Sequence, residues 1–156
     1  MTYADDLLQQ ADSLCSLDPR RPKEANLRRA VSAAYYALFH QLTETASALL
    51  LPARHDELRA QLRRKFQHNV MKKVAQATTS RTPPPISDVR YVADAFAILQ
   101  EARHDADYNF SRSFAKAEAN LHIRRARDAM QRLQNSAGTP DGDRFLLELL
   151  AGRLDA

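Results

Sequence analysis

Apolar residues recur along most of this chain at steps of three and four positions, which is the period of an amphipathic helix. The pattern is clearest over residues 23–51, and Pro52 ends it. Six apolar residues share one face of that predicted helix: Leu27, Val31, Ala34, Leu38, Leu42 and Leu49. Further helices are predicted over residues 4–17, 55–75, from residue 87 or 88 into the stretch 99–110, and over 113–135 and 144–154.

The apolar faces of the later helices differ in character. Over residues 55–75 the apolar positions are four residues apart and the other faces are basic: Leu58, Leu62, Phe66 and Val70. Over residues 113–135 most of the face is small, which lets another helix pack closely: Ala115, Ala119, Ala126, Ala129 and Leu133. The tail carries one leucine face, so we expect it to dock on another surface: Leu146, Leu147, Leu150 and Leu154.

The distribution of glycine and proline predicts an all-α fold. All three glycines follow residue 137, so residues 1–137 can form neither a phosphate-binding P-loop nor a dinucleotide fingerprint. Tight β-hairpins, whose turns favour glycine, are disfavoured for the same reason. The stretch "QATTSRTPPPIS" predicts an extended loop. We predict an up-and-down bundle of four main helices with short flanking helices at both ends. The bundle covers residues 1–137, and a linker and C-terminal amphipathic helix cover 138–156.

Length and composition are typical of one soluble globular domain. The chain has 156 residues, of which 44% are hydrophobic and 27% charged. No apolar run approaches the roughly 18 to 20 residues that cross a bilayer, and the N-terminus is acidic where a signal peptide is basic. We therefore expect a cytoplasmic protein that does not enter a membrane. Cys15 is the single cysteine and is expected to pack as a small hydrophobe.

Positive charge is concentrated in two segments. The net charge of the chain is +4, whereas residues 54–73 carry +5 and residues 112–132 carry +4, so the remainder is acidic. Such clustering is typical of a surface that binds phosphates, although a solvated helix face has the same composition. Phe66 and Phe114 lie in these segments and could stack on bases, but their positions suit the core better.

A polar stripe runs along the predicted helix of residues 23–51. Arg29, Ser32, Tyr36 and His40 follow one another at three- and four-residue steps, with Tyr35 and Phe39 beside them. One interpretation is a structural helix of a bundle, whose tyrosine hydroxyls reach the rim of the core. The other is a polar lining that orients a group from another helix.

The histidines do not predict a metal site. Their spacing lacks the paired arrangement of zinc hydrolases, and consecutive residues such as His104 and Asp105 diverge around a helix. Serine and cysteine nucleophiles have no local signature here either. We therefore expect no metal and no cofactor.

Arg103 lies on the apolar stripe that Val92, Phe96 and Leu99 define. A buried arginine keeps its charge and needs an acceptor. Asp107, one turn later, offers a structural partner within the same helix. A bound phosphate is the alternative acceptor, which would make Arg103 a functional residue.

Two motifs resemble those of the HEPN domains. "LRRAVSAAYYALFH" (residues 27–40), followed by "EARHDADYNF" (residues 101–110), is similar to the small prokaryotic single-domain group of that family, and the resemblance covers residues 20–135. It implies a four- to five-helix up-and-down bundle that usually forms a homodimer. It also implies membership of a family that includes toxin and defence ribonucleases, many of them encoded beside a minimal nucleotidyltransferase that acts as antitoxin or partner.

The resemblance further implies a metal-independent ribonuclease site made of an arginine and a histidine. The arginine would stabilise charge on the phosphate, and the histidine would handle the proton of the 2′-hydroxyl or leaving group. The arginine corresponds to Arg103 and its polar neighbour to His104. The position of the histidine is occupied by Tyr108, a poor general base because its usual pKa is about 10. His40, on the polar stripe, is another histidine that could approach Arg103.

Three hypotheses about function follow. The first is a dimeric HEPN-like domain of a toxin–antitoxin or defence system that binds RNA or a nucleotide. Its polar cleft would contain Arg103, Asp107, Tyr108 and Tyr36, with Ser32, His40 and Arg29 nearby. The second is a ribonuclease in which Tyr108 or His104 replaces the histidine. The third is a protein-interaction module that uses the C-terminal tail to hold a partner such as a nucleotidyltransferase.

Overall fold

The chain folds into helices packed around one core. A computed structural model describes residues 1–155, and within that range it contains seven α-helices and no β-strand. A short 3-10 turn, Ala53–His55, precedes the third α-helix. The α-helices are α1 (Tyr3–Ser16), α2 (Glu24–Leu50), α3 (Asp56–Arg63), α4 (His68–Thr79), α5 (Ser87–Tyr108), α6 (Lys116–Ser136) and α7 (Pro140–Ala151).

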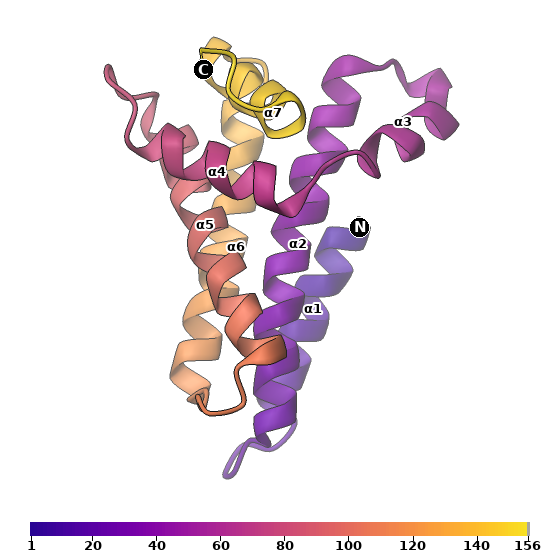
Figure 1. Cartoon of the computed structure of the whole chain (residues 1–156). Coiled ribbons are helices and arrows are strands. Elements are labelled where there is room, and N and C mark those ends of the chain that lie inside the picture. Colours follow the sequence, from indigo (N-terminus) through magenta and orange to yellow (C-terminus); the bar gives the residue numbers. More distant parts are fainter. Residues whose placement is uncertain (156) are drawn as a thin grey trace.

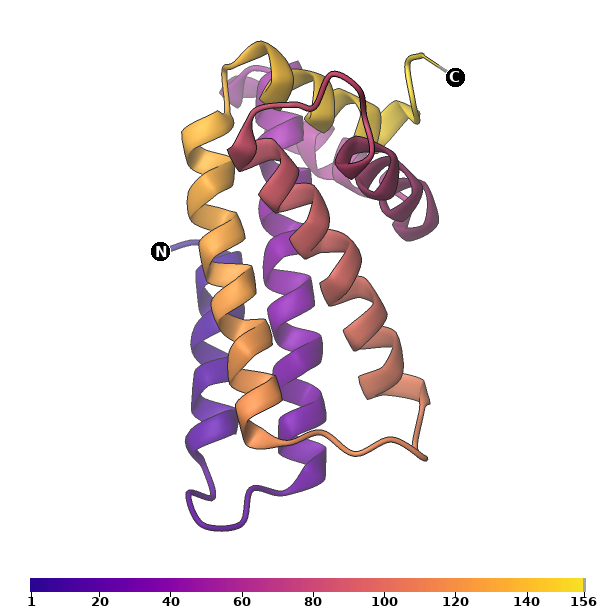
Figure 2. The same cartoon turned by 90° about the vertical axis from the view of Figure 1, so that its left-hand side faces the viewer.

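Four of these helices run alongside one another. Figures 1 and 2 show α1, α2, α5 and α6 lengthwise in the body of the molecule, with α2 in contact with the other three. The three shorter helices gather at one end, where α4 and α7 cross the bundle and α3 projects from it (Figure 1). None of the helices in residues 1–155 has a stretch long and apolar enough to span a bilayer.

Most of the predicted apolar faces are buried. On α2 the predicted apolar positions between Leu27 and Leu42 are buried in the core, as expected. On α6 the predicted small residues between Ala119 and Ala129 are buried as well. Leu49 is an exception: it is 43% exposed, because it lies in the last turn of α2, at the end of the bundle from which α3 projects. Cys15 is buried, in agreement with its expected packing role.

The prediction of one helix over residues 55–75 was wrong. The chain turns after Arg63: the amide of Lys65 donates to the carbonyl of Leu62 at 2.9 Å, and Gln67 is extended. This turn lets Phe66 enter the core and redirects α4 across the bundle, whereas α3 keeps little contact and leaves Leu58 exposed. Neither glycine nor proline marks the turn, so the apolar spacing alone predicted a continuous helix.

The C-terminal helix α7 packs on the bundle. It contacts α4 and α2 and buries Phe145, Leu146 and Leu149, whereas Leu147 and Leu150 of the predicted leucine face are only partly buried. Leu154, which the leucine pattern placed on that face, lies beyond the helix and is exposed. The fully buried Glu148 carboxylate accepts hydrogen bonds from Arg81 at 2.8 Å and from Arg144 at 3.2 Å, with its pKa held below the usual range.

Candidate functional site

The polar stripe of α2 forms the floor of a groove. The groove has a volume of about 620 Å³ and lies between α1 and α5, both of which contact α2. Arg29, Ser32 and Tyr36 line it from α2, and Leu7 and Leu14 line it from α1. These three residues of the stripe therefore face an open groove rather than the core.

The end of α5 supplies the opposite wall of the groove. Asp107 and Tyr108 line it, so five of the predicted site residues meet here. The Ser32 hydroxyl donates to the Asp107 carboxylate at 3.4 Å across the groove. Arg103, His104 and His40 do not line the groove itself.

Arg103 lies at the edge of this groove among tyrosines. Its Cζ atom is 5.0 Å from the ring centroid of Tyr35 and 5.8 Å from that of Tyr36. The side chain is only 13% exposed, and its ion pair with Asp107 spans 3.9 Å between Nη1 and Oδ2. The Arg103 Nε–H is buried and has no hydrogen-bond partner in the structure. The expected pair with Asp107 is present, but it leaves the guanidinium incompletely satisfied.

His68, a histidine that the sequence analysis did not single out, contacts Tyr35, the tyrosine whose ring lies 5.0 Å from Cζ of Arg103. His68, the first residue of α4, shares a short hydrogen bond through Nδ1 with the hydroxyl of Tyr35. Its ring stacks on Phe39 with the centroids 4.5 Å apart, and its carbonyl accepts a hydrogen bond from Gln100 at 3.1 Å. Because 35 residues separate His68 from Arg103 and the turn before α4 was not foreseen, no local pattern could have joined them.

Burial and the Arg103 charge set the protonation of these groups. Burial lowers the pKa of His68 below its ordinary value, the positive charge of Arg103 lowers it further, and the nearby His40 acts in the same direction. Burial also lowers the pKa of His40, with Arg63 adding to the effect. The pKa of Tyr35 is raised far above its usual value, mainly by burial. At neutral pH the site therefore holds neutral histidines and a protonated tyrosine beside a permanent cation.

His104 and Tyr108 make no direct contact with Arg103 among the interactions of residues 1–155. Both are exposed on α5, and their rings lie 5.2 Å apart, centroid to centroid. Within residues 1–155 no hydrogen bond, ion pair or aromatic contact joins either of them to Arg103. Their proposed catalytic roles stay predictions, but His68 is the histidine whose environment the Arg103 charge influences.

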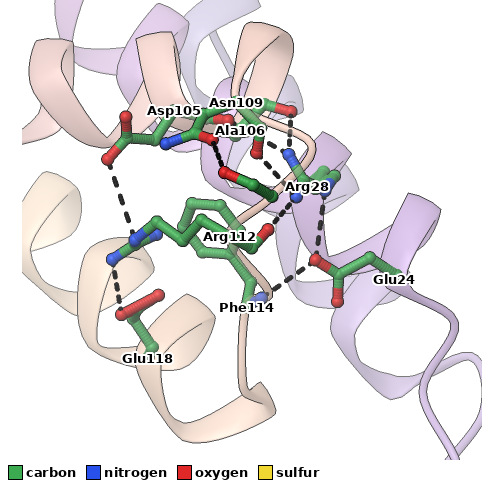
Figure 3. Close-up of polar contacts among 9 residues, drawn as sticks. Glu24, Arg28, Asp105, Ala106, Asn109, Arg112, Phe114 and Glu118 are labelled. Atoms are coloured by element: carbon green, nitrogen blue, oxygen red, sulfur yellow. Dashed lines mark hydrogen bonds and ion pairs between the residues drawn. The ribbon is translucent and has the colours of Figure 1, made fainter.

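The end of α5 is held in position by Arg28, a residue that the sequence analysis did not single out (Figure 3). Its guanidinium donates to the carbonyls of Asp105 and Ala106 at 3.0 Å each, and to those of Asn109 and Arg112. Its Nε donates to Glu24 at 3.1 Å. The Ala106 carbonyl is one that the end of a helix leaves free, the Asp105 carbonyl also accepts from the amide of Asn109, and the other two carbonyls belong to the loop after α5. Arg28 thereby fixes the part of α5 that carries Asp107 and Tyr108.

Glu24 completes this arrangement. Its Oε1 atom accepts from Arg28 and also from the backbone amide of Phe114 at 2.9 Å (Figure 3). Arg112 lies over the Phe114 ring, 4.2 Å from its centroid, and pairs with Glu118 at 2.9 Å. Phe114 is buried, in agreement with its expected place in the core. The loop between α5 and α6 is thus tied to the first turn of α2.

The two basic segments differ in how their charges are used. On and near α6, three arginines form ion pairs: Arg112, Arg127 and Arg132. In the segment of residues 54–73, no Lys or Arg forms an ion pair with any acidic side chain of residues 1–155. The segment of residues 54–73 includes α3 and the start of α4, where His68 lies. Its positive charge is therefore the more available of the two.

The described residues contain no cluster of three or more His, Cys, Asp or Glu side chains arranged to hold a metal ion. Comparison with known proteins found no family model, no curated protein and no solved structure that matches this chain.

Proposed function

We propose that this chain is a HEPN-like domain that binds a phosphate group of RNA or a nucleotide at Arg103. The observation that carries the proposal is the incomplete pairing of a largely buried guanidinium. The motifs of residues 27–40 and 101–110 support it independently. The up-and-down HEPN bundle, in which α1, α2, α5 and α6 would be the main helices, is part of the proposal.

A comparison of two arginines supports a ligand at Arg103. Arg28 has a carboxylate and four carbonyls as acceptors, which is the pattern of a structural arginine. Within residues 1–155, Arg103 has a single carboxylate partner, Asp107 at 3.9 Å, and its Nε–H has no hydrogen-bond acceptor. A buried cation with unused donors is unfavourable unless another acceptor completes it. A phosphate carries several strong acceptor oxygens and would satisfy these donors.

The charge around the site also favours an anion. Lys65 and Lys72 flank His68 in sequence, and neither forms an ion pair in residues 1–155. Arg63 lies close enough to His40 to lower the pKa of its imidazole. Such unpaired cations attract a polyanion and account for salt-dependent binding.

Titration of a labelled single-stranded RNA at several salt concentrations tests the proposal. We expect affinity that falls with salt in the wild type and drops at least tenfold in Arg103→Ala. Arg90→Ala is the matched control, because Arg90 is an exposed arginine on the same helix without an ion pair. No binding at low salt, or equal loss in Arg90→Ala and Arg103→Ala, would contradict it.

Metal-independent ribonuclease activity is a second candidate function, favoured by the position of His68. A neutral imidazole beside a cationic arginine has the two properties that RNA cleavage by proton transfer needs. Because the pKa of Tyr35 is raised, its hydroxyl stays protonated and its oxygen can accept a hydrogen bond from Nδ1–H of His68, which leaves the Nε2 lone pair free to take a proton. Incubation of mixed RNA with chelator tests this candidate. Cleavage is expected to disappear in His68→Ala and to survive in His104→Ala.

The resemblance also supports a homodimer within a toxin–antitoxin or defence system, with a nucleotidyltransferase as a possible class of partner. Tyr108 and Phe110 are 64% and 80% exposed beside the groove and would be covered by such a contact. Sedimentation velocity of the wild type and of Phe110→Asp tests the dimer. A single species with the same sedimentation coefficient in both would speak against it.

A further inference from the structure

A continuous group of aromatic side chains lies beside Arg103 and is open to solvent. Its members, here called the aromatic surface, are Tyr3, Tyr36, Phe39, His40 and His68. The Tyr3 and His40 rings meet edge to face at 4.9 Å, and Phe39 lies 5.4 Å from His40 and 4.5 Å from His68, centroid to centroid. Tyr3 is 61% exposed and the other four are partly exposed, so this group is not part of the core.

The exposed Tyr3 ring is held in place by its own helix. Tyr3 is the first residue of α1, and Thr2 caps that helix. The Thr2 hydroxyl accepts from the amide of Asp5 at 3.2 Å, while the Asp5 carboxylate accepts from the Thr2 amide at 2.9 Å. This reciprocal cap stabilises the first turn. The ring is therefore pre-organised on the surface rather than carried by a frayed end.

Cations lie on two sides of the aromatic surface. Arg103 is 5.8 Å from the Tyr36 ring, and Arg63 acts on His40 from the direction of α3. Glu44, one turn after His40, is the acidic side chain that acts on that imidazole in the opposite sense. Neither arginine is neutralised by a close ion pair in residues 1–155. Flat apolar rings between cations match the alternation of bases and phosphates in a single strand.

We propose that the aromatic surface stacks the bases of a single-stranded nucleic acid whose backbone phosphate binds at Arg103. The inference rests on the proposed function and adds the form of the ligand to it. In a duplex the base faces are covered by their neighbours, so a duplex cannot use this surface. Stacking on an aromatic side chain is independent of sequence, because every base has a flat face.

Paired oligonucleotides separate stacking from phosphate binding. A single-stranded RNA and an abasic ribose-phosphate chain of equal length carry the same backbone charge, but only the RNA has bases. We expect the wild type to bind the RNA at least about tenfold more tightly than the abasic chain, a ratio within the range found for single stacked bases. Arg103→Ala should weaken the binding of both ligands.

Variants at Tyr3 assign the difference to the aromatic surface. Tyr3→Ala should lose most of the preference for bases and bind the abasic chain like the wild type. Tyr3→Trp should keep the preference and introduce the only tryptophan in the chain, whose fluorescence should be quenched by the RNA and not by the abasic chain. Tyr91→Ala is the control, since Tyr91 is a tyrosine outside the aromatic surface, on the distant half of α5, with its ring centroid 4.2 Å from Cζ of Arg132.

The outcomes distinguish the two proposals. Equal affinity for RNA and abasic chain, or a loss in Tyr3→Ala that is the same for both ligands, overturns base stacking and leaves phosphate binding at Arg103 intact. Preference for a duplex over the single strand overturns it as well. Failure of the wild type to bind either ligand overturns both proposals.

Discussion

The guanidinium of Arg103 lies 5.0 Å from the ring centroid of Tyr35, and the hydroxyl of the same tyrosine is hydrogen-bonded to His68. One buried ring thus connects a permanent cation on α5 to an imidazole at the start of α4. The cation lowers the pKa of His68, and burial raises that of Tyr35. An anion that binds at Arg103 should therefore be sensed by His68.

Replacing Arg103 should remove binding without unfolding the protein. Arg103→Met loses the cation–π contact with Tyr35, which contributes about 1 to 2 kcal/mol to stability. The same substitution removes a buried N–H donor without an acceptor, which costs about 1 to 3 kcal/mol, so the two effects largely cancel. We expect the free energy of unfolding in urea to change by less than about 1 kcal/mol. A loss above about 3 kcal/mol would show that Arg103 is mainly structural.

Arg28 should behave in the opposite way. Arg28→Ala removes the donors that satisfy the end of α5 and the following loop, so we expect a destabilisation of about 2 to 4 kcal/mol. Its neighbour Arg29 is exposed and forms no ion pair within residues 1–155, and Arg29→Ala should change stability by less than about 0.5 kcal/mol. Urea denaturation of the two variants provides the comparison. Equal stability losses would refute the structural role of Arg28.

Affinity for a phosphate ligand should rise as the pH falls below 7. His68 is neutral in the free protein because its pKa is lowered, and a bound phosphate favours its protonated form. Binding then takes up a proton, which strengthens it by at most about tenfold per pH unit. Anisotropy titrations at pH 7.5 and 6.0 measure the effect. His68→Gln should flatten the pH dependence and His104→Gln should not; the reverse result would exclude His68 from the site.

Stability should fall in acid because of His122. Burial, with Arg125 and Arg112 nearby, lowers the pKa of this residue to about 4, whereas in the unfolded chain it is about 6.5. As the pH falls, His122 is protonated in the unfolded chain before it is protonated in the folded protein, which favours unfolding. The stabilising contribution of neutral His122 to the free energy of unfolding is therefore fully present above pH 6.5 and decreases as the pH falls towards 4, by about 3 kcal/mol at most. Unfolding free energies at pH 7 and 4.5 should differ less in His122→Gln than in the wild type. An unchanged difference would contradict this assignment.

The sequence predicted those parts of the molecule that depend on local periodicity. The core faces of α2 and α5, the all-α class, and the meeting of Ser32, Tyr36 and Asp107 follow from residues three and four positions apart on two long helices. The turn before α4 could not be predicted, because it depends on Phe66 entering the core and not on a helix-breaking residue.

The unforeseen turn also hid the composition of the site. Only the redirection of α4 places His68 against Tyr35 and Phe39, so a histidine 35 residues away from Arg103 became its neighbour. Arg28 was missed for a related reason. Its acceptors are backbone carbonyls of α5 and the following loop, and backbone groups leave no signature in the sequence.

The most direct test of the phosphate site at Arg103 is an NMR titration of the ¹⁵N-labelled protein with a short single-stranded RNA, following the side-chain Nε–H signals of the arginines. This N–H of Arg103 has no hydrogen-bond partner within residues 1–155, so it should show the largest shift, and His68 should shift with it. Arg124 and Arg125, in the second basic segment on α6, serve as internal controls and should stay nearly unchanged. Shifts confined to α6, with the Arg103 signal unmoved at saturation, would contradict the account.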